Sequence, residues 1–254
     1  MEKNSGVHMF YKNLGETPGE AVLRFKKENP EYDFLPITYA GRLDPMAEGL
    51  LILLSEGALK EKEKYLGLPK TYEFEILWCF QTDSLDILGE IVNVKLGEVG
   101  FEHLKEAVQK KFGKFEQLYP AYSSRPVGGK SLFEWAREGK INEIEIPKHE
   151  VEIYNSELIE RRTMSGEDLL KEIKRRIMLV NGDFRQETTI KKWEESIKGK
   201  EKEIFTLDKF RIDVSSGFYV RQFVTDLGQE LSIPATVFHI KRIKVGEYDV
   251  AKIS

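Results

Sequence analysis

The sequence is poor in cysteine, in histidine and in long apolar runs, and each shortage excludes a class of protein. A single cysteine, Cys79, excludes an intramolecular disulfide and a zinc site built on cysteines. The four histidines show no paired spacing of the kind that metal ligands have, so we expect no metal site. The longest apolar run, residues 50–54, is too short to cross a bilayer, and the N-terminus lacks the pattern of a secretory signal. We therefore expect a cytoplasmic protein with no membrane contact.

An excess of positive charge is also missing. The chain carries 39 Lys and Arg against 43 Asp and Glu, which gives a formal net charge of −4. Such a balance lacks the global basic field of many nucleic-acid binders, although a cationic groove can exist on an acidic protein. The hydrophobic share of 41% and the charged share of 32% are typical of a globular protein. Any affinity for nucleic acid is therefore expected at one focused site.

Local patterns predict a mixture of helices and strands. Thr17 to Glu20 form a capping box with proline at the first helical position, which predicts a helix over 18–29. Alternating apolar residues at Tyr72, Phe74 and Ile76 predict a half-buried strand, with residues 90–96 as its partner strand. Further helices are predicted over 101–112 and 219–230, strands over 210–214 and 246–250, and a mobile loop over 117–131. This mixture predicts an α/β or α+β fold.

One aspartate stands in a short segment dense in glycine and proline, Gly41-Arg42-Leu43-Asp44-Pro45. Proline pushes the residue before it toward extended geometry, so Asp44 is not an ordinary mid-helix carboxylate. An Asp-Pro pair is also typical of a helix N-cap or a type I turn. Taken alone, the pair favours such a structural role over catalysis.

The surrounding residues carry a family resemblance. Gly41-Arg42-Leu43-Asp44-Pro45-x-Ala47-x-Gly49-Leu50 resembles the catalytic motif of the TruB family of RNA pseudouridine synthases. Five other segments match that family in the same order along the chain: 11–17, 70–72, 82–89, 119–139 and 214–228. The chain is identified as similar to this family on these six ordered segments.

The resemblance implies a pseudouridine synthase catalytic fold. We expect a central mixed, largely antiparallel sheet, flanked by helices and loops, with the active-site cleft along it. Residues 1–254 are expected to form a single catalytic domain with a thumb-like loop at about 117–139. Residues 160–203 have no counterpart in the family core and predict a helical insertion, with Ser165 capping an amphipathic helix. The PUA-like RNA-binding module of bacterial relatives is expected to be absent.

The resemblance also implies a reaction. A member of this family is an isomerase, an intramolecular transferase that breaks the N-glycosidic bond of a uridine, rotates the base and rejoins it through carbon. It requires no cofactor and no metal. Asp44 then acts on the ribose, either as nucleophile or as base, while Arg221 keeps it ionised and Tyr72 stacks on the base and assists a proton transfer. From the residues alone, the favoured interpretation of Arg221 is an ordinary surface arginine or one at a helix start, and that of Tyr72 is a core-facing strand aromatic.

Eight further residues are expected to bind substrate. Val220 resembles an apolar wall against the flipped uracil, Lys12 would steer phosphate, and Lys70 would order the pocket. Thr82, Asp83 and Asp86 are interpreted as residues that brace a loop, because they lack the spacing of a calcium site. The expected substrate-binding residues are Tyr39, Gly41, Arg42, Lys12, Lys70, Val220, Arg125 and Lys130.

The RNA substrate is the open part of the hypothesis. Tyr39 stands where the family usually carries a histidine that helps to flip the target nucleotide, and Tyr39 can itself stack on a base. The leading expectation is a monomer that modifies uridine 55 in the T-loop of tRNA. The alternatives are another stem-loop in tRNA, ribosomal RNA or mRNA, or a non-catalytic protein that binds or folds RNA.

Overall fold

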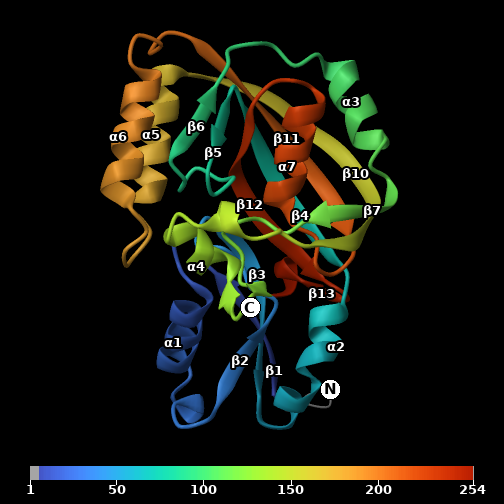
Figure 1. The fold of residues 1–254 in the computed structure, drawn as a ribbon. Helices are drawn as coiled ribbons and strands as arrows, with labels where there is room; N and C mark the ends of the chain where they lie inside the picture. The colour runs from blue at the N-terminus through green and yellow to red at the C-terminus, as the bar shows by residue number, and fades with distance from the viewer. Residues whose placement is uncertain (1–5, 254) are drawn as a thin grey trace.

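The computed structural model describes residues 6–253, and a nine-stranded sheet runs through it (Figure 1). Seven strands lie in the order β1–β3–β12–β4–β11–β10–β7, while β2 pairs with β3 and β13 with β12. Only the β3–β12 pair of this sheet is parallel, so the predicted mixed, largely antiparallel sheet is confirmed. The strands are β1 (Val7–Lys12), β2 (Ile37–Ala40), β3 (Ala47–Ser55), β4 (Lys70–Trp78), β7 (Gly113–Leu118), β10 (Lys148–Ser165), β11 (Ile204–Val214), β12 (Ala235–Val245) and β13 (Tyr248–Asp249).

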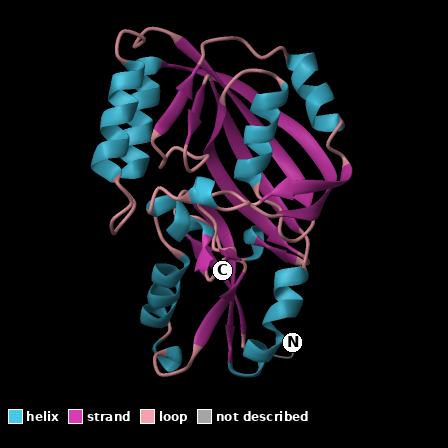
Figure 2. Cartoon of the chain, viewed as in Figure 1, coloured by secondary structure: helices cyan, strands magenta, loops and turns pink. Residues whose placement is uncertain are grey.

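Helices cover this sheet, and two small hairpin sheets lie beside it (Figure 2). The helices α5 and α6 pack against each other at one side of the molecule, with α5 next to β10 and β11, whereas α7 packs on β12 and β4 (Figure 1). No described helix is long and apolar enough to span a membrane. The helices are α1 (Pro18–Glu28), α2 (Lys62–Gly67), α3 (Phe101–Gln109), α4 (Leu132–Arg137), α5 (Gly166–Ile177), α6 (Gln186–Ile197) and α7 (Val220–Glu230). The small sheets pair β5 (Phe80–Thr82) with β6 (Ile91–Val94), and β8 (Pro126–Val127) with β9 (Lys130–Ser131).

The apolar run at 50–54 is continuous because β3 is buried on both faces. Leu50, Ile52 and Leu54 pack into one cluster with Tyr65 of α2, whereas the two leucines between them pack into another with Phe25 of α1. A strand covered on both sides has no position for a polar residue. The turn that carries Asp44 therefore leads directly into a strand that is buried along residues 49–55.

The main hydrophobic core ties α7 to the sheet. The ring of Phe74 on β4 stacks on Phe210 of β11 at 5.8 Å and meets Phe223 of α7 edge-on at 6.2 Å. All three rings are at most 2% exposed. Burial of each such side chain is worth about 2–3 kcal/mol, so the start of α7, where Arg221 lies, is firmly placed.

Several predicted elements are confirmed and others need correction. The capping box of α1 is present, with Glu20 N donating to Thr17 Oγ1 at 3.2 Å. Ser165 caps α5 as predicted, accepting from the backbone of Asp168. The expected pairing of 90–96 with the strand at 72–76 is wrong. Cys79 has a φ of 78°, which ends β4, and the chain then forms β5 as the partner of β6.

Three other predicted segments also differ from the structure. The helix predicted to reach residue 112 ends at Gln109. The segment predicted as a loop over 117–131 contains the β8–β9 hairpin, because Gly128 and Gly129 both adopt positive φ at its turn. The last long strand is Ala235–Val245, and 246–250 holds only the two residues of β13. Propensity could not reveal β12, since its register depends on β3 and β4.

Candidate active site

Asp44 lies in a tight turn between β2 and β3. The backbone N–H of Ala47 donates to the Asp44 carbonyl at 3.0 Å, which closes a β-turn with Pro45 at its second position. The Pro45 carbonyl in turn accepts from Gly15 N at 2.9 Å. Gly49 has a φ of 107°, and a Cβ there would lie 2.3 Å from the Arg242 carbonyl of β12. The turn therefore has a structural role. Its backbone hydrogen bonds and close packing hold the Asp44 carboxylate in one position.

Arg221 holds that carboxylate. Its Nε donates to Asp44 Oδ2 at 2.8 Å, while Nη1 donates to the Ser84 carbonyl at 2.6 Å and Nη2 to the Tyr122 carbonyl at 3.0 Å. The side chain is 3% exposed. Burial opposes its charge, but Asp44 and Asp86 together raise the pKa of Arg221 above its usual range. A cation in the first turn of a helix also opposes the helix dipole, so Arg221 is placed for this contact and not for the stability of α7.

A second carboxylate faces the same guanidinium. Asp86 Oδ2 lies 4.0 Å from Arg221 Nε, and Asp86 Oδ1 accepts from Ser84 Oγ at 2.7 Å and Leu88 N at 3.0 Å. Burial raises the pKa of Asp86 to about 6, with Arg221 opposing the shift and Asp44 adding to it. The predicted bracing role is confirmed by the two bonds to Oδ1. The proximity to Arg221 was not predicted, because it joins residues distant in sequence.

Aromatic residues surround the pair. Burial and the negative charge of Asp44 raise the pKa of Tyr219 to about 12, with smaller contributions from Tyr119 and Tyr72. The ring of His149 stacks on Tyr119 at 4.0 Å and meets Tyr219 edge-on at 5.9 Å. Tyr72 is partly buried against the main core, and no hydrogen bond between described residues joins it to Asp44. These rings are all partly buried, and an aromatic ring face suits stacking of a base.

Gln117 fixes the residue at the N-terminus of α7. Its side-chain amide accepts from Tyr219 N at 2.8 Å and donates to the Tyr219 carbonyl at 3.1 Å. Both bonds come from one side chain of β7. Neither Gln117 nor His149 was predicted at the site, since only the pairing of β7 with β10 brings them to α7.

The two lysines expected to meet RNA do not face solvent. Lys12 is fully buried, and its ammonium donates to the carbonyls of Ala47 and Asn13 at 2.5 and 3.1 Å. Lys70 is 7% exposed and donates to the Leu66 carbonyl at 2.5 Å. Burial lowers the pKa of each to about 8. The prediction that Lys12 steers phosphate is therefore wrong, because an enclosed ammonium cannot reach RNA. Lys70 likewise supports α2 and not a bound ligand.

The other predicted binding residues are more accessible, with one exception. Arg42 is exposed and donates to Tyr39 Oη at 3.3 Å. Arg125 lies over the Tyr119 ring at 5.1 Å, and Lys130 pairs with Glu138 at 2.7 Å. The Gly41 carbonyl accepts from Arg242. Val220 is only 4% exposed, so little of its side chain is available to a bound base.

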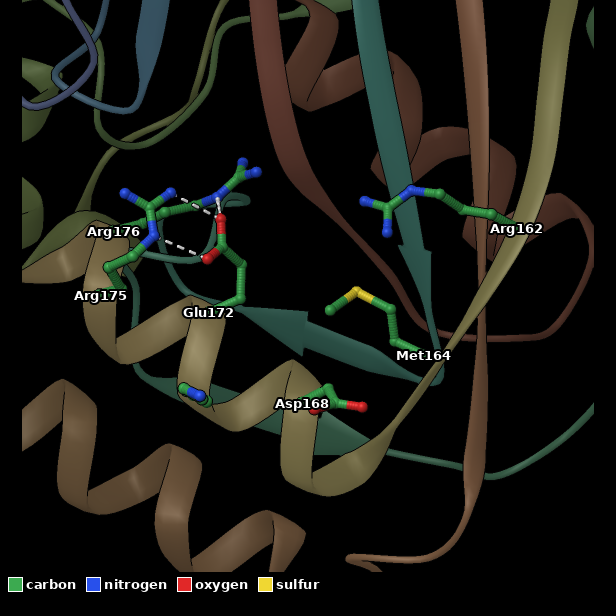
Figure 3. A pocket seen from close by; sticks show the side chains of 7 residues that line it. Arg162, Met164, Asp168, Glu172, Arg175 and Arg176 are labelled. Atoms are coloured by element: carbon green, nitrogen blue, oxygen red, sulfur yellow. Dashed lines mark hydrogen bonds and ion pairs between the residues drawn. The ribbon is translucent and has the colours of Figure 1, made fainter.

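A separate hollow of about 330 Å³ lies between β10 and α5. Figure 3 shows Arg175 and Arg176 both directed at Glu172, while Arg162 extends from β10. Arg162 is itself paired with Glu75 at 2.9 Å. These carboxylates neutralise the guanidinium groups, and none of the lining residues is a partner of Asp44. We therefore assign the site to the Asp44 turn.

No metal cluster accompanies that turn. Among residues 6–253, no three or more His, Cys, Asp or Glu side chains are grouped so that they could hold a metal ion. Its carboxylates are instead held by an arginine and by backbone or hydroxyl donors. The chemistry of the site is that of a carboxylate beside a fixed cation and aromatic rings.

Comparison with known proteins agrees with this geometry. Residues 32–183 match the family described as TruB family pseudouridylate synthase (N terminal domain). The tRNA pseudouridine synthase B of Aquifex aeolicus is 28% identical over 96% of this chain, which covers 70% of that protein. The protein of the same name from Lactobacillus acidophilus is 29% identical over 98% of this chain and 71% of its own.

Solved structures share the fold. A crystal structure of a Cbf5-Nop10-Gar1 complex contains a chain that superposes with a TM-score of 0.58 over 96% of this chain, at 17% identity. A structure of an H/ACA RNP bound to a substrate RNA containing 2'-deoxyuridine gives a TM-score of 0.56 at 16% identity. The present chain spans about half the length of each of those chains: 50% and 48%.

Proposed function

The chain belongs to the TruB family of pseudouridylate synthases, and from this premise we propose that it isomerises a uridine of RNA to pseudouridine. The observation that carries the proposal is the contact between Asp44 Oδ2 and Arg221 Nε at 2.8 Å. The two residues lie 177 positions apart in sequence, within two of the six segments that resemble the family. A carboxylate beside a buried, fixed cation is the arrangement that the reaction requires.

Asp44 is proposed as the group that acts on the ribose. Arg221 occupies Oδ2, whereas Oδ1 has no hydrogen-bond partner among the described residues, and the side chain is 33% exposed. One carboxylate oxygen is thus free to meet a substrate, either as a nucleophile at C1′ or as a base in an elimination. The N-glycosidic bond breaks, the base rotates, and a bond from C1′ to carbon replaces it. A proton leaves that carbon and one is gained at nitrogen, so the reaction is balanced without a co-reactant.

The base must be extruded from its stack before Asp44 can reach its sugar. Tyr72 is proposed to stack on that base and assist the proton transfer, and the neighbouring Tyr219 keeps its proton at neutral pH because its pKa is about 12. Tyr39, Arg42, Arg125 and Lys130 are proposed to contact the RNA around it. Three of these side chains are exposed, namely those of Arg42, Arg125 and Lys130.

The proposed substrate is the T-loop of tRNA, at uridine 55. The support for tRNA is that relatives covering nearly the whole chain are named tRNA pseudouridine synthase B. Tyr39 favours a second candidate, a uridine in another stem-loop, because it replaces the histidine usual beside the motif. The protein is proposed to act in the cytoplasm as a monomer.

Purified protein incubated with unmodified tRNA and with a T-arm stem-loop tests the proposal. Pseudouridine is then mapped by chemical probing. We expect Asp44→Asn to lower the rate at least about 10³-fold while RNA binding changes little, since this substitution removes the reactive charge and preserves the shape. Asp33→Asn, at an exposed carboxylate outside the site, is the matched control and should retain the wild-type rate.

The possible outcomes separate the hypotheses. If the protein modifies a uridine outside the T-loop, the second candidate substrate replaces the first. Full activity of Asp44→Asn removes this aspartate from the reaction. A wild-type protein that binds these RNAs but modifies none of their uridines is a non-catalytic RNA-binding or RNA-folding protein.

A further inference from the structure

The connection between α5 and α6, residues 178–185, touches several segments that build the site. The Leu179 carbonyl lies against Gly15, which itself holds the Asp44 turn. The Asp183 carbonyl accepts from Arg137 of the thumb-like segment at 3.5 Å. The connection therefore lies beside both the Asp44 turn and the thumb-like segment.

The connection contacts the loop after β5 most directly through its last residue, Arg185. Its Nη1 donates to Asp83 Oδ2 at 2.9 Å and to Glu90 Oε1 at 3.3 Å, and its guanidinium lies over the Tyr122 ring at 5.2 Å. Arg185 has a φ of 61°, a left-handed conformation that a residue with a Cβ adopts only when its surroundings hold it there. Its backbone N–H donates to Asp183 Oδ1.

The same loop and the same tyrosine hold Arg221. Asp83 Oδ2 accepts a second hydrogen bond from Tyr122 Oη at 2.9 Å. The backbone carbonyls of Tyr122 and Ser84, the residue after Asp83, are two of the three acceptors of the Arg221 guanidinium. Arg185 and Arg221 therefore both contact the loop after β5 and the segment around Tyr122.

We infer that Arg185 is a positioning residue for the reaction proposed above, on which this inference rests. Through Asp83 it holds the Tyr122 and Ser84 carbonyls in place around Arg221, and Arg221 in turn holds Asp44. The ion pair is 37% exposed on the arginine side, and exposed ion pairs add little to the stability of a fold. Its effect on the rate can be larger, because a misplacement of about 1 Å at a reacting group costs about 10²-fold.

The test compares three variants in single-turnover reactions with an RNA that the wild type modifies. Arg185→Ala removes the guanidinium that binds Asp83, and Arg185→Lys keeps a charge that can still reach Asp83. Lys174→Ala is the matched control, because it breaks the ion pair between α5 and α6, Lys174 Nζ to Glu194 Oε1 at 2.6 Å, without touching Asp83. For each we measure the rate at saturating enzyme, the Kd for the RNA and the midpoint of thermal unfolding.

We expect Arg185→Ala to slow the single-turnover step about tenfold or more, with the Kd changed less than about threefold. Arg185→Lys should recover most of the loss, and Lys174→Ala should keep the wild-type rate. The inference is overturned if Arg185→Ala reacts at the wild-type rate, or if its rate falls no more than that of Lys174→Ala. A loss confined to RNA affinity overturns it as well.

A second measurement does not depend on activity. The Nε–H of Arg221 is buried against Asp44, so its proton should exchange slowly with solvent and give a distinct NMR signal. Arg185→Ala should shift that signal and speed its exchange, whereas Lys174→Ala should leave it unchanged. If the wild type modifies no RNA, the proposed function fails, and this measurement still decides whether Arg185 positions Arg221. An unchanged signal in Arg185→Ala would show that it does not.

Discussion

The buried carboxyl of Asp86 makes stability depend on pH in a direction opposite to that of most aspartates. Its pKa rises from the ordinary 3.8 to about 6, because burial disfavours the charged form more than Arg221 favours it. The folded state then binds more protons than the unfolded state between these two values. The free energy of unfolding must therefore fall as the pH rises through this range, and level off above it.

The magnitude follows from the two pKa values. At about 1.4 kcal/mol for each pH unit, the interval from 3.8 to about 6 corresponds to about 3 kcal/mol in total. About 2 kcal/mol of this falls between pH 4 and pH 8, because a small part is already lost below pH 4. Asp86→Asn removes the charge and preserves an oxygen that can accept from Ser84 and Leu88.

Urea unfolding of the wild type and of Asp86→Asn, at half-unit steps from pH 4 to pH 8, checks this prediction. Groups distant from Asp86 titrate alike in both proteins, so the wild-type value minus the variant value isolates Asp86 together with its coupling to Asp44 and Arg221. That difference should fall by about 2 kcal/mol with rising pH and then stay constant. The corresponding difference for Asp33→Asn, at an exposed aspartate, should not fall. A flat or rising difference for Asp86→Asn would refute the reasoning.

Two further predictions concern the residues that support the Asp44 turn. Gly15→Ala should destabilise the protein by at least about 2 kcal/mol in urea unfolding, because the residue has a φ of 90° and a Cβ would lie 2.5 Å from the Leu179 carbonyl. Gly57→Ala, where a Cβ meets nothing within 4 Å, is its control, and an equal effect of both would contradict the argument. Burial lowers the pKa of Lys12 from 10.5 to about 8, so the folded state binds fewer protons and Lys12 should contribute about 2 kcal/mol to a rise in stability between pH 8 and pH 10. Lys12→Met should lose this contribution and keep the one from Lys70, whose pKa burial also lowers to about 8, and a variant that keeps the whole rise would contradict the argument.

Sequence reasoning reached furthest where the controlling interactions are local. The capping box of α1 and the Ser165 cap of α5 each depend on contacts within three residues, and both are present. Alternation predicted the strand at β4 but was wrong about its half-buried character, because residues 74–78 are all buried, including Glu75, which pairs with Arg162. It failed for β12 and for the pairing of 90–96, since strand partners lie far away along the chain.

The difference between local contacts and contacts with distant residues also explains which charged residues were predicted correctly. A lysine in sequence predicts a solvated surface charge, and only the pairing of β1 with β3 encloses Lys12 beside Ala47. Asp86 was placed correctly as a loop brace from its local spacing. Its position 4.0 Å from Arg221 arises because α7 packs against the sheet close to the loop after β5. Arg185 could not be connected with the site at all, because its partners lie about one hundred residues earlier.

The sequence by itself determined that Asp44 stands in a proline-stiffened turn and that six ordered segments resemble one enzyme family. Those properties are written in neighbouring residues and in their order, which folding does not alter. The tertiary structure decided which charges meet. It placed Arg221 between Asp44 and Asp86, removed Lys12 and Lys70 from the surface, and brought Arg185 to the loop that supports Arg221. Burial and ion pairing depend on contacts between distant residues, and only the packed sheet and its helices create them.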